Sequence, residues 1–143
     1  MAYKYIIDKP SNCIFVEHTG RFTFEEASVF YLELMQDSGF KPNMNILRDL
    51  RAAKFPEDTD YQTVALQARK VFDVFDRDLE RAKIALVAAD GHDYKILHQW
   101  ILAGRLASGD VERRVFRSME EAKSWLGLAE DHPITFQDFV AMV

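Results

Sequence analysis

Charged and hydroxyl side chains gather where three predicted parallel strands end. Arg48, Asp49 and Arg51 belong to the end of one strand, Asp90 and His92 follow the next, and Arg117 and Ser118 follow the last. Because ligand sites in open α/β sheets lie at the carboxyl ends of the strands, these residues form a candidate ligand or partner edge. A cryptic enzyme that uses Asp49, Arg51 and His92 is one hypothesis for this polar site. Helix capping and surface ion pairs are the interpretation we favour, because capping alone explains Asp90 and Ser118.

Motifs for cofactor and metal chemistry do not occur in the sequence. The six glycines are scattered, so neither a Gly-rich phosphate loop nor a G-x-S-x-G nucleophile elbow is formed. His92 and His98 are six residues apart, whereas two ligands on one helix face are three or four apart. Cys13 is the only cysteine and opens a strand-like run, which favours a buried structural role. We therefore predict no metal, no cofactor and no catalytic residue.

The composition is ordinary for one globular domain. The chain has 143 residues with 18 basic and 23 acidic side chains, a balance that argues against a nucleic-acid binder. One cysteine excludes an intramolecular disulfide and fits a reducing compartment. The first residues do not have the pattern of a signal peptide, and no apolar run reaches the roughly twenty residues of a membrane span. We expect a cytoplasmic protein without an integral membrane segment.

Strand-like and helical patterns alternate along the chain. The five expected strands are residues 3–8, 13–19, 44–50, 82–89 and 111–117. Four helices follow the second to fifth strands. In chain order, the residues expected to begin these helices are Thr23, Thr59, Asp90 and Ser118. Three of them open possible capping boxes: Thr23 with Glu26, Thr59 with Gln62 and Ser118 with Glu121. Glycines 39, 109 and 127 are expected to end the first, third and fourth helices.

The element order β-β-α-β-α-β-α-β-α predicts an α/β fold with a five-stranded mixed, mostly parallel sheet. Residues 82–89 are apolar at nearly every position, as in a central strand covered on both faces. Residues 111–117 are highly charged, which places them at a sheet edge. We expect one domain over residues 1–127.

Residues 128–143 are expected to be an extension of this domain and not a second domain. A turn at residues 130–133 precedes a short helical stripe. The stripe consists of Phe136, Phe139, Val140 and Val143, which recur at helical spacing. A helix this short is not stable alone, so it must dock on its own chain or on a partner, and we favour its own chain.

Several phrases of the sequence resemble bacterial SpoIIAA-like, or STAS-like, proteins. These phrases are Gly-Arg-Phe-Thr-Phe-Glu-Glu (20–26), Asn-Ile-Leu-Arg-Asp-Leu-Arg (45–51), Ile-Ala-Leu-Val-Ala (84–88) and Val-Phe-Arg-Ser-Met-Glu-Glu-Ala (115–122). The resemblance covers residues 3–127 and implies a β-α superhelical sheet with helices mainly on one face, an architecture that SEC14-type lipid carriers share. Anti-sigma-factor antagonists of this family carry a phosphorylatable hydroxyl after the third strand. Residues 49–55 contain none, so the resemblance does not extend to that phosphorylation switch.

The predicted strands are apolar on both sides. Ile14 and Val16 alternate with Phe15, and Ile46 alternates with Leu47. If the helices cover one face, something must cover the other, because large exposed apolar patches are rare on soluble monomers. The candidates are the 128–143 extension, a second subunit or an apolar ligand.

These observations support three functional hypotheses. The first is a non-enzymatic binding or regulatory module, a homodimer that acts by protein–protein interaction. The second, by analogy with the SEC14-type architecture, is a carrier or sensor of a small apolar or amphipathic ligand such as a lipid. The third is the cryptic enzyme at the polar strand edge.

Overall fold

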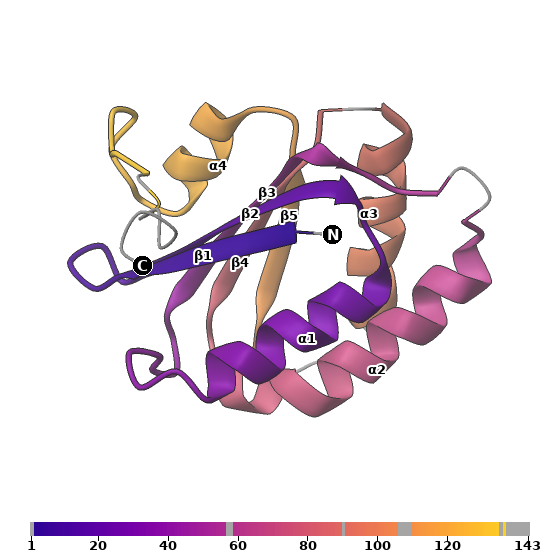
Figure 1. The fold of residues 1–143 in the computed structure, drawn as a ribbon, viewed down its shortest axis with the longest axis horizontal. Helices are drawn as coiled ribbons and strands as arrows, with labels where there is room; N and C mark the ends of the chain where they lie inside the picture. The colour runs from indigo at the N-terminus through magenta and orange to yellow at the C-terminus, as the bar shows by residue number, and fades with distance from the viewer. Residues whose placement is uncertain (1, 57–58, 90, 106–109, 135, 137–143) are drawn as a thin grey trace.

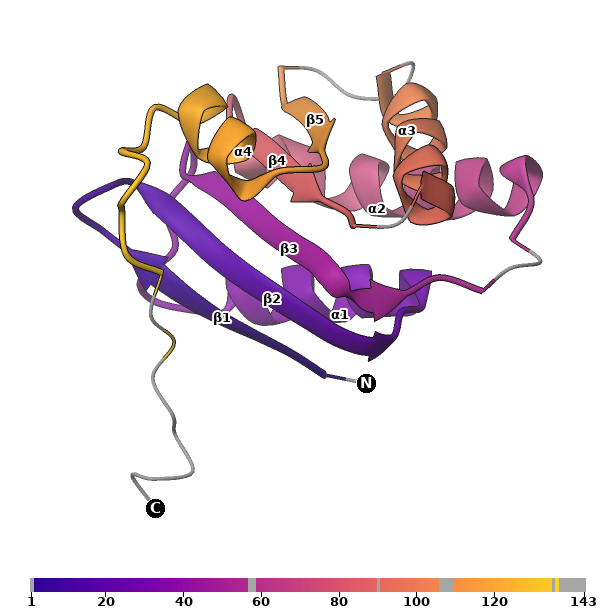
Figure 2. The same cartoon turned by 90° about the horizontal axis from the view of Figure 1, so that it is seen from above.

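The structure is a computed structural model that describes residues 2–56, 59–89, 91–105, 110–134 and 136. Five strands form one sheet, with helices on both of its faces (Figures 1 and 2). The strands are β1 (Ala2–Asp8), β2 (Cys13–Arg21), β3 (Asn45–Lys54), β4 (Lys83–Val87) and β5 (Glu112–Phe116). The helices are α1 (Phe24–Met35), α2 (Tyr61–Leu79), α3 (Gly91–Arg105) and α4 (Met119–Trp125). The predicted order of elements and the mixed α/β sheet are confirmed.

The strands lie side by side in sequence order, from β1 at one edge to β5 at the other. β1 runs antiparallel to β2, and the other neighbours are parallel. Each parallel crossover advances by one strand in the same direction, so right-handed connections place α1, α2 and α3 on the same face of the sheet. The charged β5 therefore lies at a sheet edge, as its composition predicts.

The main core lies between this helical face and helices α1, α2 and α3. Ile14 and Val16 of β2 and Ile46 of β3 contribute to it, together with aromatic and aliphatic side chains from the three helices. The alternation of side chains along each strand explains the division, because the neighbouring residues Phe15 and Leu47 point to the opposite face.

That opposite face, called here the second face, is covered by helix α4 and the segment after it. Phe15, Leu47, Val87 and Phe116 form a second apolar cluster with Ala122 of α4. Leu128, Ile134 and Phe136 pack against the same cluster. The expected covers were the 128–143 extension, a second subunit or an apolar ligand. The extension therefore covers part of this face. Phe136 docks on its own chain, whereas Phe139, Val140 and Val143 lie outside the described residues.

Two helix boundaries differ from the predictions, the end of α1 and the start of α2. Thr23 is the N-cap residue of α1, but its side chain makes no capping hydrogen bond, and the helix ends at Met35 well before Gly39. Asp60, not Thr59, caps α2: the Asp60 carboxylate accepts from the Thr63 backbone N–H at 2.7 Å. Ser118 caps α4 as predicted, accepting from the Glu121 N–H at 3.3 Å.

Strand β3 is longer than predicted and continues to Lys54. Thr19, Gly20 and Arg21 of β2 pair with Ala52, Ala53 and Lys54 after a register shift that places one extra residue in β3 between Asp49 and Ala52. Arg51 therefore lies within the strand and not in a turn after it.

None of the helices in the described part of the chain has the length and apolar character that a membrane span requires.

Candidate functional site

Arg48 does not lie at a ligand edge, contrary to the prediction. It points from β3 into the helical core, where only 3% of its surface is exposed. Its guanidinium donates to the His18 ring from Nε at 3.2 Å, and its Nη2 lies 3.0 Å from the same Nε2 atom. The charge also lies 5.4 Å from the centre of the Phe30 ring. Successive side chains of β3 point to opposite faces of the sheet. Arg48 lies between the second-face residues Leu47 and Asp49, so it must face the helices.

Asp49 and Arg51 are brought together on β3. The Arg51 guanidinium donates to both oxygens of the Asp49 carboxylate, at 2.9 and 2.8 Å, and the Arg51 backbone N–H donates to the same group at 3.1 Å. This hydrogen bonding raises the pKa of Arg51. The pair borders a small cavity of about 170 Å³ on the second face, together with Glu17, Met119, Ile134 and Phe136. Each charge of the pair is thus matched by the other.

The remaining residues of the predicted polar edge have separate partners. The His92 ring lies 3.4 Å from the Pro56 carbonyl oxygen, and the Arg117 guanidinium lies 4.6 Å from the centre of the Tyr94 ring. Ser118 caps α4. Asp90 lies outside the described residues. The favoured interpretation, capping and local pairing, therefore describes Asp49, Arg51 and Ser118.

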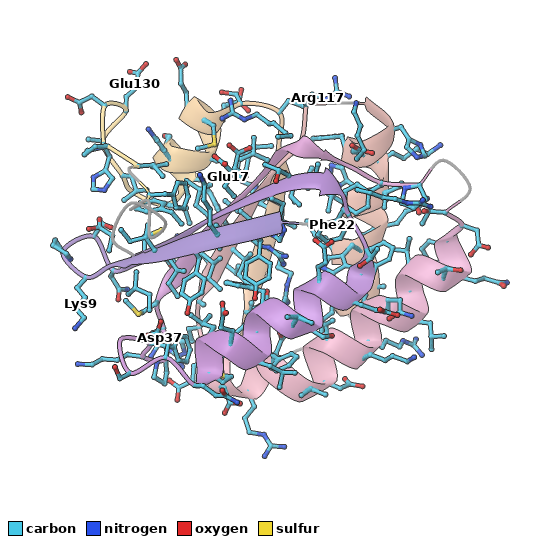
Figure 3. The ribbon with its side chains drawn as sticks, in the orientation of Figure 1. Lys9, Glu17, Phe22, Asp37, Arg117 and Glu130 are labelled. Atoms are coloured by element: carbon cyan, nitrogen blue, oxygen red, sulfur yellow. The ribbon has the colours of Figure 1, made fainter. Side chains whose placement is uncertain are left out.

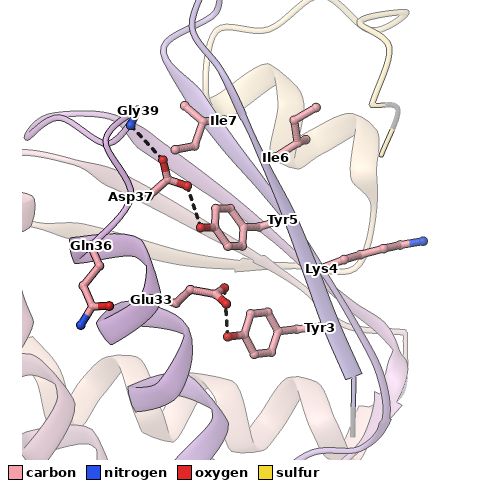
Figure 4. Close-up of a pocket in the computed structure, with 9 residues that line it drawn as sticks. All are labelled: Tyr3, Lys4, Tyr5, Ile6, Ile7, Glu33, Gln36, Asp37 and Gly39. Atoms are coloured by element: carbon pink, nitrogen blue, oxygen red, sulfur yellow. Dashed lines mark hydrogen bonds between the residues drawn. The ribbon is translucent and has the colours of Figure 1, made fainter. Parts of the chain in front are cut away.

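A larger concavity than the cavity on the second face lies beside the opposite edge of the sheet, along β1 (Figure 4). We call it the β1 groove; its volume is about 690 Å³, and it lies between β1 and the carboxyl end of α1. The Tyr3 hydroxyl donates to the Glu33 carboxylate at 3.2 Å, and the Tyr5 hydroxyl donates to Asp37 at 2.7 Å. Figure 3 shows Arg117 well away from Asp37, so the groove is distinct from the predicted polar edge.

The outer side of β1 carries backbone groups that face away from the sheet. The Asn45 N–H of β3 donates to the carbonyl of Asn12, which directly precedes β2, at 3.0 Å. Because backbone groups alternate in direction along a strand, those of the even-numbered β2 residues also point toward β3. Odd-numbered residues of β2 therefore face β1, where Phe15 pairs with Ile6. The even-numbered residues of β1 use their backbone groups on β2. Tyr3, Tyr5 and Ile7 consequently direct their N–H and C=O groups outward, into the β1 groove.

Neither the family models nor the curated proteins compared with this chain match it. The resemblance to SpoIIAA-like proteins thus stays a prediction. Among the described residues, no three His, Cys, Asp or Glu side chains are grouped so that they could hold a metal ion.

A buried polar cluster, which sequence reasoning missed, lies between β1 and β3 on the helical side of the sheet. It consists of His18, Glu26 and Arg48, all less than 9% exposed. Since Arg48 donates to Nε2 of His18, the ring carries its proton on Nδ1, which lies 3.9 Å from the Glu26 carboxylate. Burial, followed by the charge of Arg48, lowers the pKa of His18 to about 2. Burial also raises the pKa of Glu26. His18 is thus a neutral acceptor that orients Arg48.

We expect His18 to make the fold sensitive to mild acid. In the unfolded chain His18 titrates near 6.5, and in the fold near 2, so the unfolded state binds the extra proton between these values. Stability is therefore lost as the pH falls below 6.5. Relative to His18→Gln, which keeps an acceptor for Arg48, the wild type should lose about 2 kcal/mol of unfolding free energy between pH 7 and pH 5. Urea denaturation at several pH values measures this difference. Equal pH dependence of the two proteins would contradict a neutral buried histidine.

Proposed function

We propose that this protein is a non-enzymatic binding module that accepts another polypeptide strand along the outer edge of β1. The observation that carries the proposal is the outward direction of the backbone groups of Tyr3, Tyr5 and Ile7 beside the β1 groove. Strand addition uses such groups for affinity and uses the flanking side chains for specificity. Exposed edges of this kind are templates for pairing with another chain.

The two sheet edges differ in their suitability for strand addition. β5 spans five residues and exposes Glu112 and Arg114, so it has the short, charged character that discourages pairing. β1 spans seven residues, and Tyr5, Ile6 and Ile7 remain partly exposed on it. The β1 edge is therefore the one that favours a protein partner.

The ligand-carrier hypothesis receives less support from the second face. Helix α4 and the segment after it pack against the apolar cluster there. The remaining cavity of about 170 Å³ is smaller than the roughly 300 Å³ at which pockets for drug-sized ligands begin. An acyl chain would have to displace Ile134 and Phe136. The β1 edge needs no such rearrangement.

Amide hydrogen exchange in an extract of the cells that make the protein tests the proposal. The tagged chain is exposed to deuterated extract, recovered under quench conditions and read residue by residue by fragmentation mass spectrometry. If a strand is added, the outward amides of Tyr5 and Ile7 should exchange at least about tenfold more slowly in extract than in buffer at a chain concentration too low for self-association. The Ile6 amide, which is already directed to β2, serves as the internal control and should change little.

A further inference from the structure

We infer that the strand added to β1 is the β1 strand of a second copy of this chain, antiparallel and centred on Ile6. This inference rests on the proposed function and names its partner. The resulting homodimer has a continuous ten-stranded sheet with the two-fold axis passing between the Ile6 residues. The direction of the backbone groups of β1 and the charges on the two faces of the strand support this arrangement.

The alternation of inward and outward backbone groups along β1 permits this register. In an antiparallel pair centred on Ile6, Tyr5 lies opposite the partner's Ile7, and both residues direct their backbone groups outward. Each of the two Tyr5–Ile7 pairs then exchanges two hydrogen bonds. Ile6 lies opposite the partner's Ile6 as a non-hydrogen-bonded pair, the type in which side chains approach most closely. Two partly exposed isoleucines thus cover each other.

Charge complementarity on the second face favours the same register. Lys4 lies opposite the partner's Asp8, and the symmetry repeats the pair at the other end of the strand. Lys4 is exposed and lies over the second face, where its Nζ is 3.6 Å from Glu17 and 5.2 Å from the centre of the Phe136 ring. Asp8, 3.0 Å from the His132 ring, lies on the same face. Opposite charges directly across an antiparallel pair stabilise it.

A second charge pair forms on the helical face. Lys9 follows β1 directly and lies opposite the partner's Tyr3, whose hydroxyl donates to Glu33 within its own chain. The Lys9 ammonium therefore approaches the partner's Glu33. A register centred on Tyr5 would instead bring together the two Asp37 carboxylates that the Tyr5 hydroxyls contact, which is unfavourable. Both faces of β1 favour the register centred on Ile6.

Cross-linking of the purified full chain tests the register. Ile6→Cys should form a covalent dimer under mild oxidation, because the two introduced thiols face each other across the axis. Lys4→Cys is the matched control on the same face, and it should stay monomeric on a denaturing gel because its counterpart lies four residues away. Burial raises the pKa of the native Cys13 thiol to about 12, so this thiol does not compete. A covalent dimer through Tyr5→Cys and not Ile6→Cys would overturn the inferred register.

The charge pairs are tested by a reversal and its rescue. The wild type should have the mass of a dimer by light scattering at micromolar concentration, and Lys4→Asp should weaken dimerisation about tenfold or more. Lys4→Asp combined with Asp8→Lys should restore a large part of the loss. A monomeric wild type over the whole concentration range would overturn the inference. If Tyr5 and Ile7 were nevertheless protected in extract, strand addition would stand and the partner would be a different protein.

Discussion

Asp76→Ala should lower the free energy of unfolding by about 3–5 kcal/mol. Asp76 of α2 and Arg113 of β5 form an ion pair in which both partners are less than 9% exposed. The Arg113 guanidinium uses both terminal nitrogens on the Asp76 carboxylate and lies 3.7 Å from the centre of the Phe72 ring. Removing the carboxylate leaves a buried guanidinium without its counter-charge, and this uncompensated charge is the main cost.

Two controls separate the ion pair from general effects of substitution on α2. Asp73→Ala changes an exposed acid one turn earlier on the same helix and should cost less than about 0.5 kcal/mol. The double variant Asp76→Leu with Arg113→Met removes both charges and should recover most of the lost stability. Urea denaturation measures all three proteins. A cost for Asp76→Ala as small as that for Asp73→Ala would show that the guanidinium finds water or another acceptor.

Gly104→Ala should destabilise the protein by about 3 kcal/mol, the upper end of the usual cost of overpacking. Gly104 of α3 lies directly against the Phe72 ring of α2, and an added Cβ would overlap Cε2 and Cδ2 of that ring. The ring cannot easily move, because it is held between Arg113 and Trp100. Helix propensity alone predicts the opposite sign, a gain of about 1 kcal/mol.

The double variant Gly104→Ala with Phe72→Leu is the matched control for this overlap. It should cost less than the sum of the two single substitutions, because leucine leaves room for the added methyl group. Thermal and urea denaturation measure the three proteins. A stabilised Gly104→Ala variant would contradict the close approach of α2 and α3.

The order of elements was predictable because local signals agree with the tertiary fold. Ser118 with Glu121 begins α4 as its capping box indicates, and the apolar run at residues 82–89 contains the buried β4. The boundary of β3 was not predictable from residues 51–54 alone. These residues join the ladder because β2 continues beside them after the register shift, which is a non-local effect.

The candidate polar edge was predicted less well than the fold. Proximity of Asp49 and Arg51 in the sequence correctly suggested a common location, but their charges satisfy each other. Arg48 is one residue away and faces the core, as the two-residue period of a strand requires. Its acceptor His18 is thirty residues away in the sequence, so their pairing appears only when β2 lies beside β3.

The β1 edge was only half visible in the sequence. Tyr3, Tyr5 and Ile7 alternate with Lys4 and Ile6, which indicates a strand with two different faces. The groove itself depends on Glu33 and Asp37 of the α1 region, whose position relative to β1 is set by the packing of α1 on the sheet. Sequence alone also does not show that β1 ends the sheet order.

Residue-resolved hydrogen exchange along β1 tests the central claim most directly, because alternate residues of one strand give opposite expectations. In cell extract, we expect strong protection of the Tyr5 and Ile7 amides, similar to that of Ile6. In buffer, at a chain concentration too low for the dimer to form, the first two should exchange rapidly while Ile6 stays protected. An Ile7→Pro variant, which removes one outward donor, should lose the protection of Tyr5, whereas Ile7→Ala should keep it. Rapid exchange of Tyr5 and Ile7 in extract, with Ile6 protected throughout, would contradict the account and leave the β1 edge without a partner strand.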